Sequence, residues 1–262
     1  MFNILQEAGR LICPYRCLLC RKRLAERYIC HSCRPPERSG ICEYNCIVCF
    51  TSTNELDVSE RCNLCALFPL PYSRVRYLWN YSDANVASFI TSMKYAPSPA
   101  LLRYACKHLA LALPYYFGSC EWDALVPMPI ARQHFRERGF DHCFQIAKTL
   151  KRCCSFVSTT PIISSALTHR GYKYAQASLP HGERIKNVRY SFKCASLVKE
   201  LKVLLIDDVI TTGATLHFAA QALLDAGAQT VDVLALAKAP VWQEMRAELY
   251  MRSTKANGCR FG

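Results

Sequence analysis

From about residue 71 onward, the spacing of apolar positions predicts alternating strands and helices. Short runs rich in branched apolar and aromatic residues predict strands at 71–82, 122–129, 202–209 and 230–237. Apolar residues three or four positions apart predict helices at 84–95, 100–113, 140–154 and 216–227. The first strand alternates and should be half-buried, whereas 202–209 is apolar on both faces, as a central parallel strand is. This order predicts a mostly parallel sheet with helices on its faces, and ligands bind beyond the carboxyl ends of such strands.

Prolines and a glycine indicate where several of these elements end. We expect Pro114 to end the second helix, Pro127 to end the second strand and Gly227 to cap the last helix. The third helix is expected to present one apolar face, formed by Phe140, Phe144, Ala147 and Leu150. No segment is long and apolar enough to cross a bilayer, and the first residues do not resemble a secretory signal. The expectation is therefore a cytoplasmic protein without a membrane span.

The first 65 residues follow another pattern, in which cysteines repeat at fixed intervals. Ten of the seventeen cysteines lie here, and eight of them form the pairs Cys17–Cys20, Cys30–Cys33, Cys46–Cys49 and Cys62–Cys65. Each half of this block opens with C-x-Y-x-C-x-x-C, so the block is duplicated. Two Cys-x2-Cys pairs can place four thiolates tetrahedrally around Zn²⁺, and the metal supplies folding energy that so small an apolar core lacks.

The cysteine pattern predicts structural zinc, as one or two ions, in a module of residues 1–68. Four pairs fit two sites of four cysteines, or one site with the remaining cysteines free. Ligation interleaved between the two halves also fits the spacing. Cys13 and Cys42 are left without a role, and the seven cysteines of the later chain are expected to be small, mostly buried apolar residues.

Positive charge is concentrated in two stretches of the later chain. The net charge is +13, to which residues 1–65 contribute nine Lys and Arg against seven Asp and Glu. Residues 132–152 hold six basic and two acidic residues, and residues 168–193 hold six and one. Such local charge attracts polyanions, either phosphorylated metabolites or nucleic acid, although a basic face that only keeps the protein soluble fits the same counts.

The stretch VLLIDDVITTGAT at 203–215 puts two aspartates and a threonine-rich turn between a buried strand and a helix. Backbone N–H groups at a helix start favour an anion, and Gly213 lets the backbone curl around it. Asp207 and Asp208 repel that anion unless they accept hydrogen bonds from hydroxyls or face a cation. A sugar phosphate with a vicinal diol supplies hydroxyls to the aspartates and a phosphate to the helix start. The alternative is that the aspartates only cap the helix and bind no ligand. The stretch lacks Gly-Lys-Ser/Thr and G-x-G-x-x-G, which excludes the common phosphate and dinucleotide loops.

This stretch resembles the ribosyl-diphosphate-binding motif of type I phosphoribosyltransferases, which use 5-phosphoribosyl 1-diphosphate as its Mg²⁺ complex. The resemblance implies that Asp207 and Asp208 hold the ribose hydroxyls. It assigns the 5′-phosphate to Thr211, Thr212, Gly213, Ala214 and Thr215. Further similarity lies in the cysteine pairs, in SMKY at 92–95, in VPMPIARQHFRERGFDH at 126–142 and in HRGYKYAQASLPHGERIKNVRYSF at 169–192. Together these stretches resemble the ComF family of phosphoribosyltransferase-like proteins from Cys17 to about Lys238.

The resemblance implies a type I phosphoribosyltransferase-like α/β domain at 69–240, after the zinc module and before a tail at 241–262. It also implies that Arg136 and Arg138 hold the diphosphate leaving group. Guanidinium forks and Mg²⁺ would there stabilise the negative charge that grows on the departing diphosphate. A solvent-exposed cluster at a helix start is the simpler alternative.

The second basic stretch contains Arg170, Gln176, Arg184 and Asn187. It resembles a run of the family that lies where related enzymes carry a loop that closes over the donor. This chain departs from the family pattern at Lys173, where the family often has Thr, and at Asp141-His142, where it usually has Asn-Gln. His142 and His169 are considered as general bases or as histidines with ordinary structural partners. Lys94 would reach a phosphate or extend along its helix.

Three functions fit these features. The first is enzymatic transfer of a 5-phosphoribosyl group to an unidentified acceptor with release of diphosphate. The second is a non-enzymatic factor that handles single-stranded DNA during natural competence, with a regulatory or vestigial ligand site. The basic stretches with interleaved Tyr and Phe suit that role, because they combine backbone contact with base stacking. The third is a scaffold whose zinc module docks another protein, such as another DNA-uptake protein.

Overall fold

The computed structural model describes residues 15–24, 28–37, 45–53, 56–67, 69–95, 98–119, 121–170 and 191–240. The expectations for Cys13, for Cys42, for the basic stretch after Arg170 and for the tail at 241–262 lie outside these residues. In the described part of the chain, no helix has the length and hydropathy that a membrane span needs.

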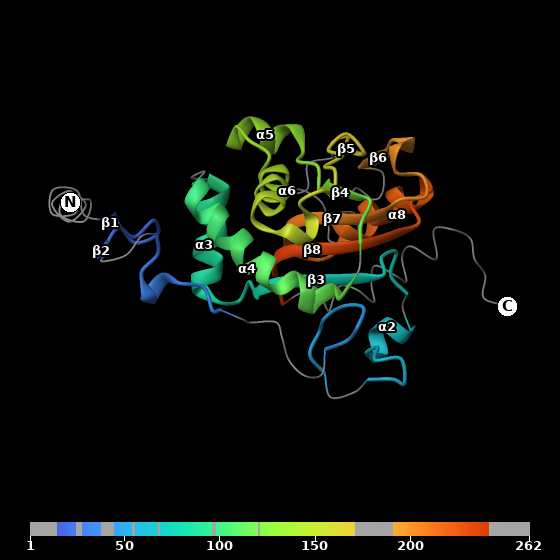
Figure 1. Ribbon diagram of the computed structural model, residues 1–262, viewed down its shortest axis with the longest axis horizontal. Helices are drawn as coiled ribbons and strands as arrows, with labels where there is room; N and C mark the ends of the chain where they lie inside the picture. The colour runs from blue at the N-terminus through green and yellow to red at the C-terminus, as the bar shows by residue number, and fades with distance from the viewer. Residues whose placement is uncertain are drawn as a thin grey trace, which may run out of the picture.

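A four-stranded sheet forms the centre of the fold, in the order β3, β8, β7, β4 (Figure 1). Its strands are β3 (Arg74–Asn80), β4 (Ala124–Pro127), β7 (Lys202–Ile210) and β8 (Thr230–Lys238). Neighbouring strands are parallel throughout. Both β7 and β8 are buried along almost their whole length, as strands covered on both faces are. The predicted parallel sheet is therefore confirmed.

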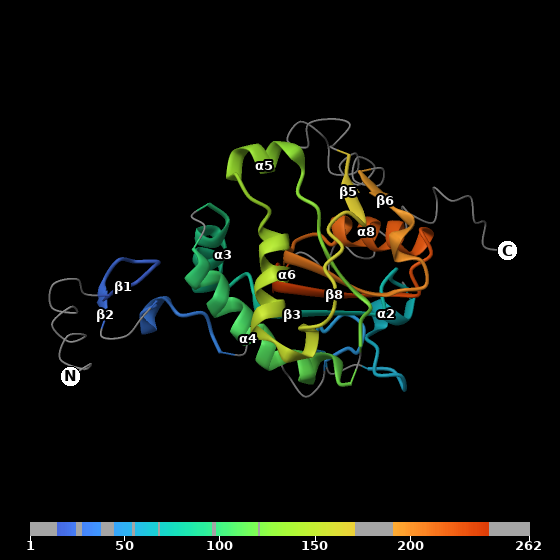
Figure 2. The same cartoon turned by 45° about the horizontal axis from the view of Figure 1, so that its top comes forward.

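Helices cover both faces of this sheet. One side carries α3 (Ala84–Tyr95), α4 (Pro99–Phe117) and α6 (His142–Cys153) (Figure 2). The other side carries α8 (Ala214–Asp225), which packs against the two-stranded sheet of β5 (Leu167–His169) and β6 (Phe192–Cys194). Between β4 and α6 lies the short α5 (Arg132–Arg138). The cysteine-rich part contains β1 (Tyr15–Arg16), β2 (Arg23–Leu24) and α2 (Asn63–Leu67), and 3₁₀ turns occur at His31–Cys33, Ser155–Val157 and Ser196–Val198.

The strand order reverses between β4 and β7. The chain crosses from β3 to β4 and then outward to residues 161–163, which hydrogen-bond Leu125 on the far side of β4. It returns to β7 and continues to β8 in the opposite direction. Right-handed crossovers therefore require α4 and α6 on one face and α8 on the other. Ligands of open parallel sheets bind at such a reversal, and here the loops after Pro127 and Ile210 flank it.

The prediction that Pro114 ends its helix is wrong, because α4 continues to Phe117. A proline removes the hydrogen bond to the carbonyl four residues earlier. Here that carbonyl belongs to Ala110, and it accepts from Cys154 Sγ at 3.9 Å instead. The last turn also buries Tyr116 and Phe117 in the core. The replacement donor and this burial offset the lost bond.

The predicted apolar face of the third helix needs correction. The helix α6 begins only at His142, because Asp141 is its N-cap and accepts from Phe144 N at 2.9 Å. Phe140 therefore lies before the helix, and Phe144 is only half-buried. The buried face is rotated and consists of His142, Cys143, Ile146, Ala147 and Leu150.

The strand β3 is also more buried than its alternating sequence predicts, with all five central residues buried. The reason is the second half of the cysteine block, which covers this edge strand. Val75 N donates to Val48 O at 2.7 Å, and Tyr77 Oη donates to Phe50 O at 3.0 Å. An edge strand that is covered in this way is protected from pairing with another chain.

Candidate functional site

The two adjacent aspartates lie in the last part of β7, next to the crevice at which the strand order reverses. Asp208 is 5% exposed, and its Oδ2 lies 2.9 Å from Lys94 Nζ and 2.6 Å from His142 Nε2. Burial alone would raise the pKa of Asp208, but the hydrogen bond from His142 and the charge of Lys94 outweigh it and lower this pKa. Asp208 is therefore an ionised carboxylate held between two nitrogen donors.

Lys94 comes from the last turn of α3, so its ammonium reaches the carboxylate from another element. Burial acts to lower the pKa of Lys94, but the charge of Asp208 more than offsets this, and the pKa is raised. A lysine that is charged inside the protein needs such a partner, because an unpaired buried charge is costly. Lys94 therefore forms an ion pair with the motif and does not extend along its helix, and its contact with a phosphate stays a prediction.

Asp207 faces a different environment on the same strand. Its Oδ1 accepts from Asp208 N at 2.8 Å and from Cys143 Sγ at 3.6 Å. Burial raises the pKa of Asp207 to about 7, and the negative charge of Asp208 adds to this rise. The two neighbouring carboxyl groups therefore differ in charge near neutral pH, with Asp208 ionised and Asp207 close to its titration point.

A third helix adds Arg138 to this network. Arg138 Nη1 lies 3.3 Å from His142 Nδ1, and its guanidinium stacks over the ring of Tyr95 at 5.5 Å. A guanidinium can only donate, so Nδ1 accepts and Nε2–H is left to donate to Asp208. Arg138, predicted at the leaving group, thus supports Asp208 through His142, while Arg136 is exposed on α5.

The turn after β7 has the backbone of an anion-binding helix start. Gly213 is the N-cap residue of α8 with φ 76°, in the left-handed region that favours glycine. Ala214 N donates to Thr212 Oγ1 at 3.4 Å. Thr211 is exposed, Thr212 and Thr215 are half-buried, and Gly213 and Ala214 are buried. The next N–H groups of the first turn have no partner within a helix and are available to an oxyanion.

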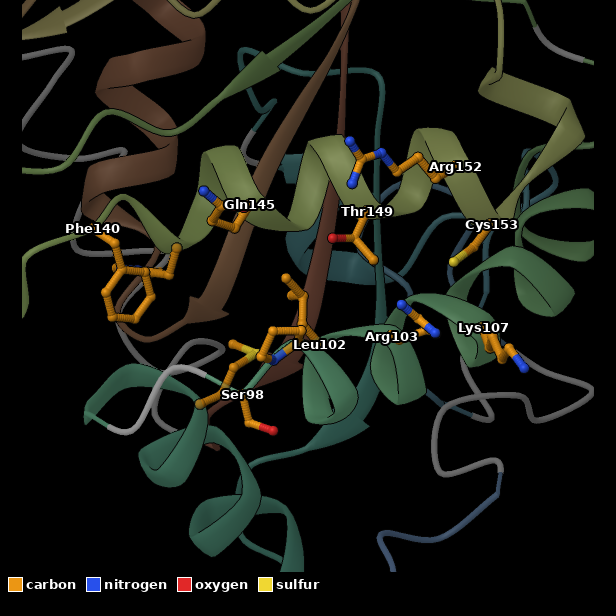
Figure 3. A pocket seen from close by; sticks show the side chains of 12 residues that line it. Ser98, Leu102, Arg103, Lys107, Phe140, Gln145, Thr149, Arg152 and Cys153 are labelled. Atoms are coloured by element: carbon orange, nitrogen blue, oxygen red, sulfur yellow. The ribbon is translucent and has the colours of Figure 1, made fainter. Parts of the chain in front are cut away.

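A groove of about 650 Å³ opens beside this site, between α4 and α6 (Figure 3). His142 lines one end of the groove and also touches Asp208, so the groove and the carboxylates are continuous. Arg103 and Lys107 of α4 and Arg152 of α6 also line it, and none of its described lining residues is acidic. In the close view, Thr149 of α6 points toward α4, and the ring of Phe140 lies at one end.

The sequence pointed to the motif but not to its partners. The sequence shows no partner for His142 and predicts only a buried apolar role for Cys143. The available signal was the departure from the family pattern at Asp141-His142. His169, the other histidine considered, lies in β5 with its ring against Phe192 at 5.2 Å.

The eight paired cysteines form two groups, each within one half of the duplicated block. The groups are Cys17, Cys20, Cys30 and Cys33, and Cys46, Cys49, Cys62 and Cys65, with all ligand atoms of a group within 4.8 Å of one another. Sγ–Sγ distances of 3.6 Å occur in both groups, between Cys20 and Cys30 and between Cys49 and Cys62. Four sulfurs about 2.3 Å from a zinc ion would lie ~3.8 Å apart. Both groups therefore fit a tetrahedral metal, and the halves do not interleave.

The two groups share details of the backbone. Arg21 N donates to Cys17 O and Phe50 N donates to Cys46 O, both at 2.9 Å. Arg21 and Phe50 both have positive φ, 65° and 55°. In each half a later amide donates to the first sulfur, Cys30 N to Cys17 Sγ at 3.4 Å and Cys62 N to Cys46 Sγ at 3.3 Å. These bonds stabilise the thiolate form that metal binding needs.

The chain is similar to known proteins both in its later part and over most of its length. A family model described as "Phosphoribosyl transferase domain" matches residues 172–258. Competence protein F of Haemophilus influenzae is 30% identical over 122 residues, 45% of this chain and 51% of that protein, so the chain spans about half the length of this relative. DNA utilization protein YhgH of Salmonella typhi is 28% identical over 239 residues, 87% of this chain and 99% of that protein.

Among solved structures, glutamine phosphoribosylpyrophosphate amidotransferase of B. subtilis aligns with a TM-score of 0.37 and 19% identity, covering 56% of this chain and 30% of that one. The sequence relatives carry the assignment, since the YhgH match extends over 87% of the chain and the family model lies within its later part. The chain is therefore distantly similar to YhgH proteins over most of its length and to competence protein F over about half of it, and residues 172–258 match the phosphoribosyltransferase domain model.

Proposed function

We propose that this chain binds 5-phosphoribosyl 1-diphosphate at the crevice between β4 and β7 and transfers its phosphoribosyl group to an acceptor. The main support is the arrangement of the 207–215 stretch: two buried carboxylates shortly before a helix start that favours an anion, at the reversal of strand order. The matched family model supports the same class of chemistry. The bond from C1 of the ribose to diphosphate breaks, diphosphate leaves with the electron pair, and an acceptor atom bonds to C1 and loses its proton.

In this proposal the carboxylates bind the sugar and the helix start binds the 5′-phosphate. Asp207 and Asp208 accept hydrogen bonds from the ribose hydroxyls, and the N–H groups and hydroxyls of Thr211–Thr215 surround the phosphate. Lys94 and His142 hold Asp208 in place before the ligand arrives. Such a fixed carboxylate costs little reorganisation when the sugar binds.

The two arginines take different roles. Arg138 is a positioning residue, because it holds His142 and, through it, Asp208. Arg136 is exposed on α5, near the crevice end of β4, and is the guanidinium that can turn toward the departing diphosphate. Mg²⁺ bound with the donor would supply further positive charge for that leaving group.

We place this activity in the use or uptake of DNA, because the relatives are named competence protein F and DNA utilization protein. The cysteine groups then hold two structural zinc ions, since all eight ligands are thiolates and leave no open coordination position. A role for the zinc module as a docking site for other DNA-uptake proteins stays a hypothesis beside this one.

Calorimetric titration with the Mg²⁺ complex of 5-phosphoribosyl 1-diphosphate tests the donor site. We expect binding by the wild type and by Asp225→Ala, an exposed aspartate at the far end of α8. Asp207→Ala/Asp208→Ala and Thr212→Val should bind at least about tenfold more weakly. Zinc content and thermal unfolding show whether each variant is folded. If a folded wild type does not bind the donor at millimolar concentration, the proposal is wrong.

Proton release on binding gives a second test, which concerns Asp207 itself. The pKa of Asp207 is raised to about 7, so part of its population is protonated at pH 6.5. Ribose hydroxyls that donate to this group favour its ionised form, and binding should release a fraction of a proton. Titrations in two buffers of different ionisation enthalpy measure that fraction, which should disappear in Asp207→Asn.

A further inference from the structure

Apart from His142, the groove between α4 and α6 has no part in the proposed donor site, yet it ends there. Its described lining includes Met93, Leu102, Phe140, His142, Gln145 and Thr149 besides the three cations. His142 is shared with the carboxylate network. A ligand in this groove would therefore lie next to the sugar-binding carboxylates.

The three cations point to the charge of that ligand. Arg103 and Lys107 lie one turn apart on α4, and Arg152 lies across the groove on α6 (Figure 3). All three are exposed, and in the described ranges none of them forms an ion pair. Like charges that line the same groove repel one another, and an anion bound in the groove neutralises them. A phosphate between the two helices meets this requirement.

The opposite end of the groove has different chemistry. The half-buried ring of Phe140 lies there, and Phe140 comes two residues before His142, the first residue of α6. Met93 and Leu102 supply an apolar surface, and the amide of Gln145 offers both a donor and an acceptor. An aromatic ring with a neighbouring amide suits a planar polar ring that stacks and forms hydrogen bonds at its edge.

The size of the groove decides between a small ligand and a polymer. About 650 Å³ lies within the range of 300–1,000 Å³ that is typical of small-molecule sites. The stretch from Gln145 to Arg152 covers about two turns of α6, or roughly 10 Å of helix. This length matches a single nucleotide with its ring at one end and its phosphate at the other.

We propose that the α4–α6 groove is the acceptor site and that the acceptor is a phosphorylated planar compound of nucleotide size. Its ring stacks on Phe140 beside the carboxylate network, and its phosphate binds between Arg103, Lys107 and Arg152. The acceptor role rests on the proposed transferase function, whereas binding of such a compound to the groove can be measured without the donor.

Calorimetric titration of the zinc-loaded full chain with the four common ribonucleoside 5′-monophosphates tests the site. Inorganic phosphate and the oligonucleotide dT8 are titrated in parallel. At least one mononucleotide should bind with submillimolar affinity, more tightly than phosphate. Arg103→Ala/Lys107→Ala/Arg152→Ala should weaken it roughly ten- to hundredfold, since three charged contacts to one phosphate are lost.

Matched variants separate the groove from general effects of charge and apolar area. Lys148→Ala/Lys199→Ala/Lys202→Ala removes the same charge from three exposed lysines outside the groove and should change the affinity less than about twofold. Phe140→Ala should weaken the mononucleotide about five- to tenfold, as loss of a stacked ring does. Phe135→Ala removes an exposed phenylalanine outside the groove and should have no effect.

Each remaining outcome overturns the assignment. Equal losses in the two triple variants would mean that binding follows net charge and not the groove. Binding of dT8 alone would replace the small acceptor with a polymer, and equal affinity for phosphate would remove the ring from the proposal. Donor binding, lost in Asp207→Ala/Asp208→Ala, is scored separately, so a failure of the donor site and a failure of the groove are distinguishable.

Discussion

The two halves of the cysteine block share one local design but differ in their relation to the sheet. In the second group all four cysteines are buried, whereas in the first only Cys17 is, and Cys20 is exposed. Figure 1 shows β1 and β2 beyond α3, and α2 close to β3. The same metal-binding turn therefore serves in one copy as a peripheral unit and in the other as a cover for the edge of the sheet. The copies differ through the residues that surround the ligands.

One pair of equivalent positions shows how this difference arises. The residue after the second cysteine has positive φ in both copies, but it is Arg21 in the first and Phe50 in the second. Phe50 packs edge-on against Tyr77 at 5.5 Å and Tyr116 at 5.0 Å, and Arg76 lies over its ring at 4.9 Å. The exposed Arg21 has no such role in the described part of the chain. The ring of Phe50 thus connects the second metal turn to both β3 and α4.

The largest difference between the two halves should follow the loss of one metal ligand. Cys49→Ser removes a buried ligand, loosens the turn that covers β3 and should lower the free energy of unfolding by on the order of 3–5 kcal/mol. Cys20→Ser removes an exposed ligand of the first group and should leave the main calorimetric transition within about 1 kcal/mol of the wild type. Zinc per chain is counted in both variants.

The results for Cys49→Ser and Cys20→Ser can contradict the proposed difference between the two halves. If Cys20→Ser lowers the main transition as much as Cys49→Ser, the first half is as strongly coupled to the sheet as the second. If both variants retain the zinc content and stability of the wild type, the groups are not structural metal sites.

The next effect concerns Phe50 itself. Phe50→Ala should cost about 3 kcal/mol of unfolding free energy, because it empties a ring-sized space between β3 and α4. Arg21→Ala at the equivalent position of the first half should cost less than about 0.5 kcal/mol, as exposed substitutions usually do. Chemical unfolding followed by tryptophan fluorescence, to which the buried Trp79 and Trp122 contribute, measures both values. Equal costs would contradict the division into a cover and a peripheral unit.

The difference between the halves also marks what sequence can and cannot predict. The spacing of the cysteines allowed several ligand schemes, and the structure has the one with four cysteines of the same half in each group. This scheme follows from the sequence because local turns bring nearby cysteines together. The burial of β3 did not follow, since it depends on Val48 and Phe50 from another segment. Local periodicity describes how a strand alternates, but it contains no information about what covers its outer face.

The candidate site divides in the same way. The 207–215 stretch and its position at the end of a central strand were predictable, because a contiguous motif carries its own geometry. The partners of Asp208 come from α3 and α6, and Arg138 from α5. Convergence of side chains from three helices depends on tertiary packing. The extension of α4 beyond Pro114 likewise depends on a donor to Ala110 O from Cys154, 44 residues after Ala110.

A smaller effect should follow when the first half loses a contact with the sheet. Trp79 Nε1 donates to Pro36 O at 2.9 Å, while the ring itself lies in the core. Trp79→Phe removes this donor and part of the ring, and should cost about 1–2 kcal/mol. Amides of residues 28–37 should lose protection from hydrogen exchange more than amides of 45–53. Equal loss in both segments would show that Trp79 supports the two halves alike.

The smallest expected effect concerns how the first half is attached to α3, and not the stability of the whole protein. Asn85 Nδ2, at the start of α3, donates to Arg34 O at 3.3 Å. Asn85→Ala loses this bond, yet alanine favours the helix by several tenths of a kcal/mol, so the free energy of unfolding should stay within about 0.5 kcal/mol of the wild type. Exchange of the amides at 28–37 should nevertheless become about two- to fivefold faster.

Ser88→Ala is the matched control for Asn85→Ala, because Ser88 is exposed on the next turn of α3. It gives a similar gain in helix propensity without touching the first half, so exchange at 28–37 should not change. A local change in Asn85→Ala alone would show that the first half can loosen while the sheet stays intact. Unchanged exchange in both variants would mean that the bond to Arg34 does not attach the first half, and the contact of Trp79 with Pro36 would have to suffice.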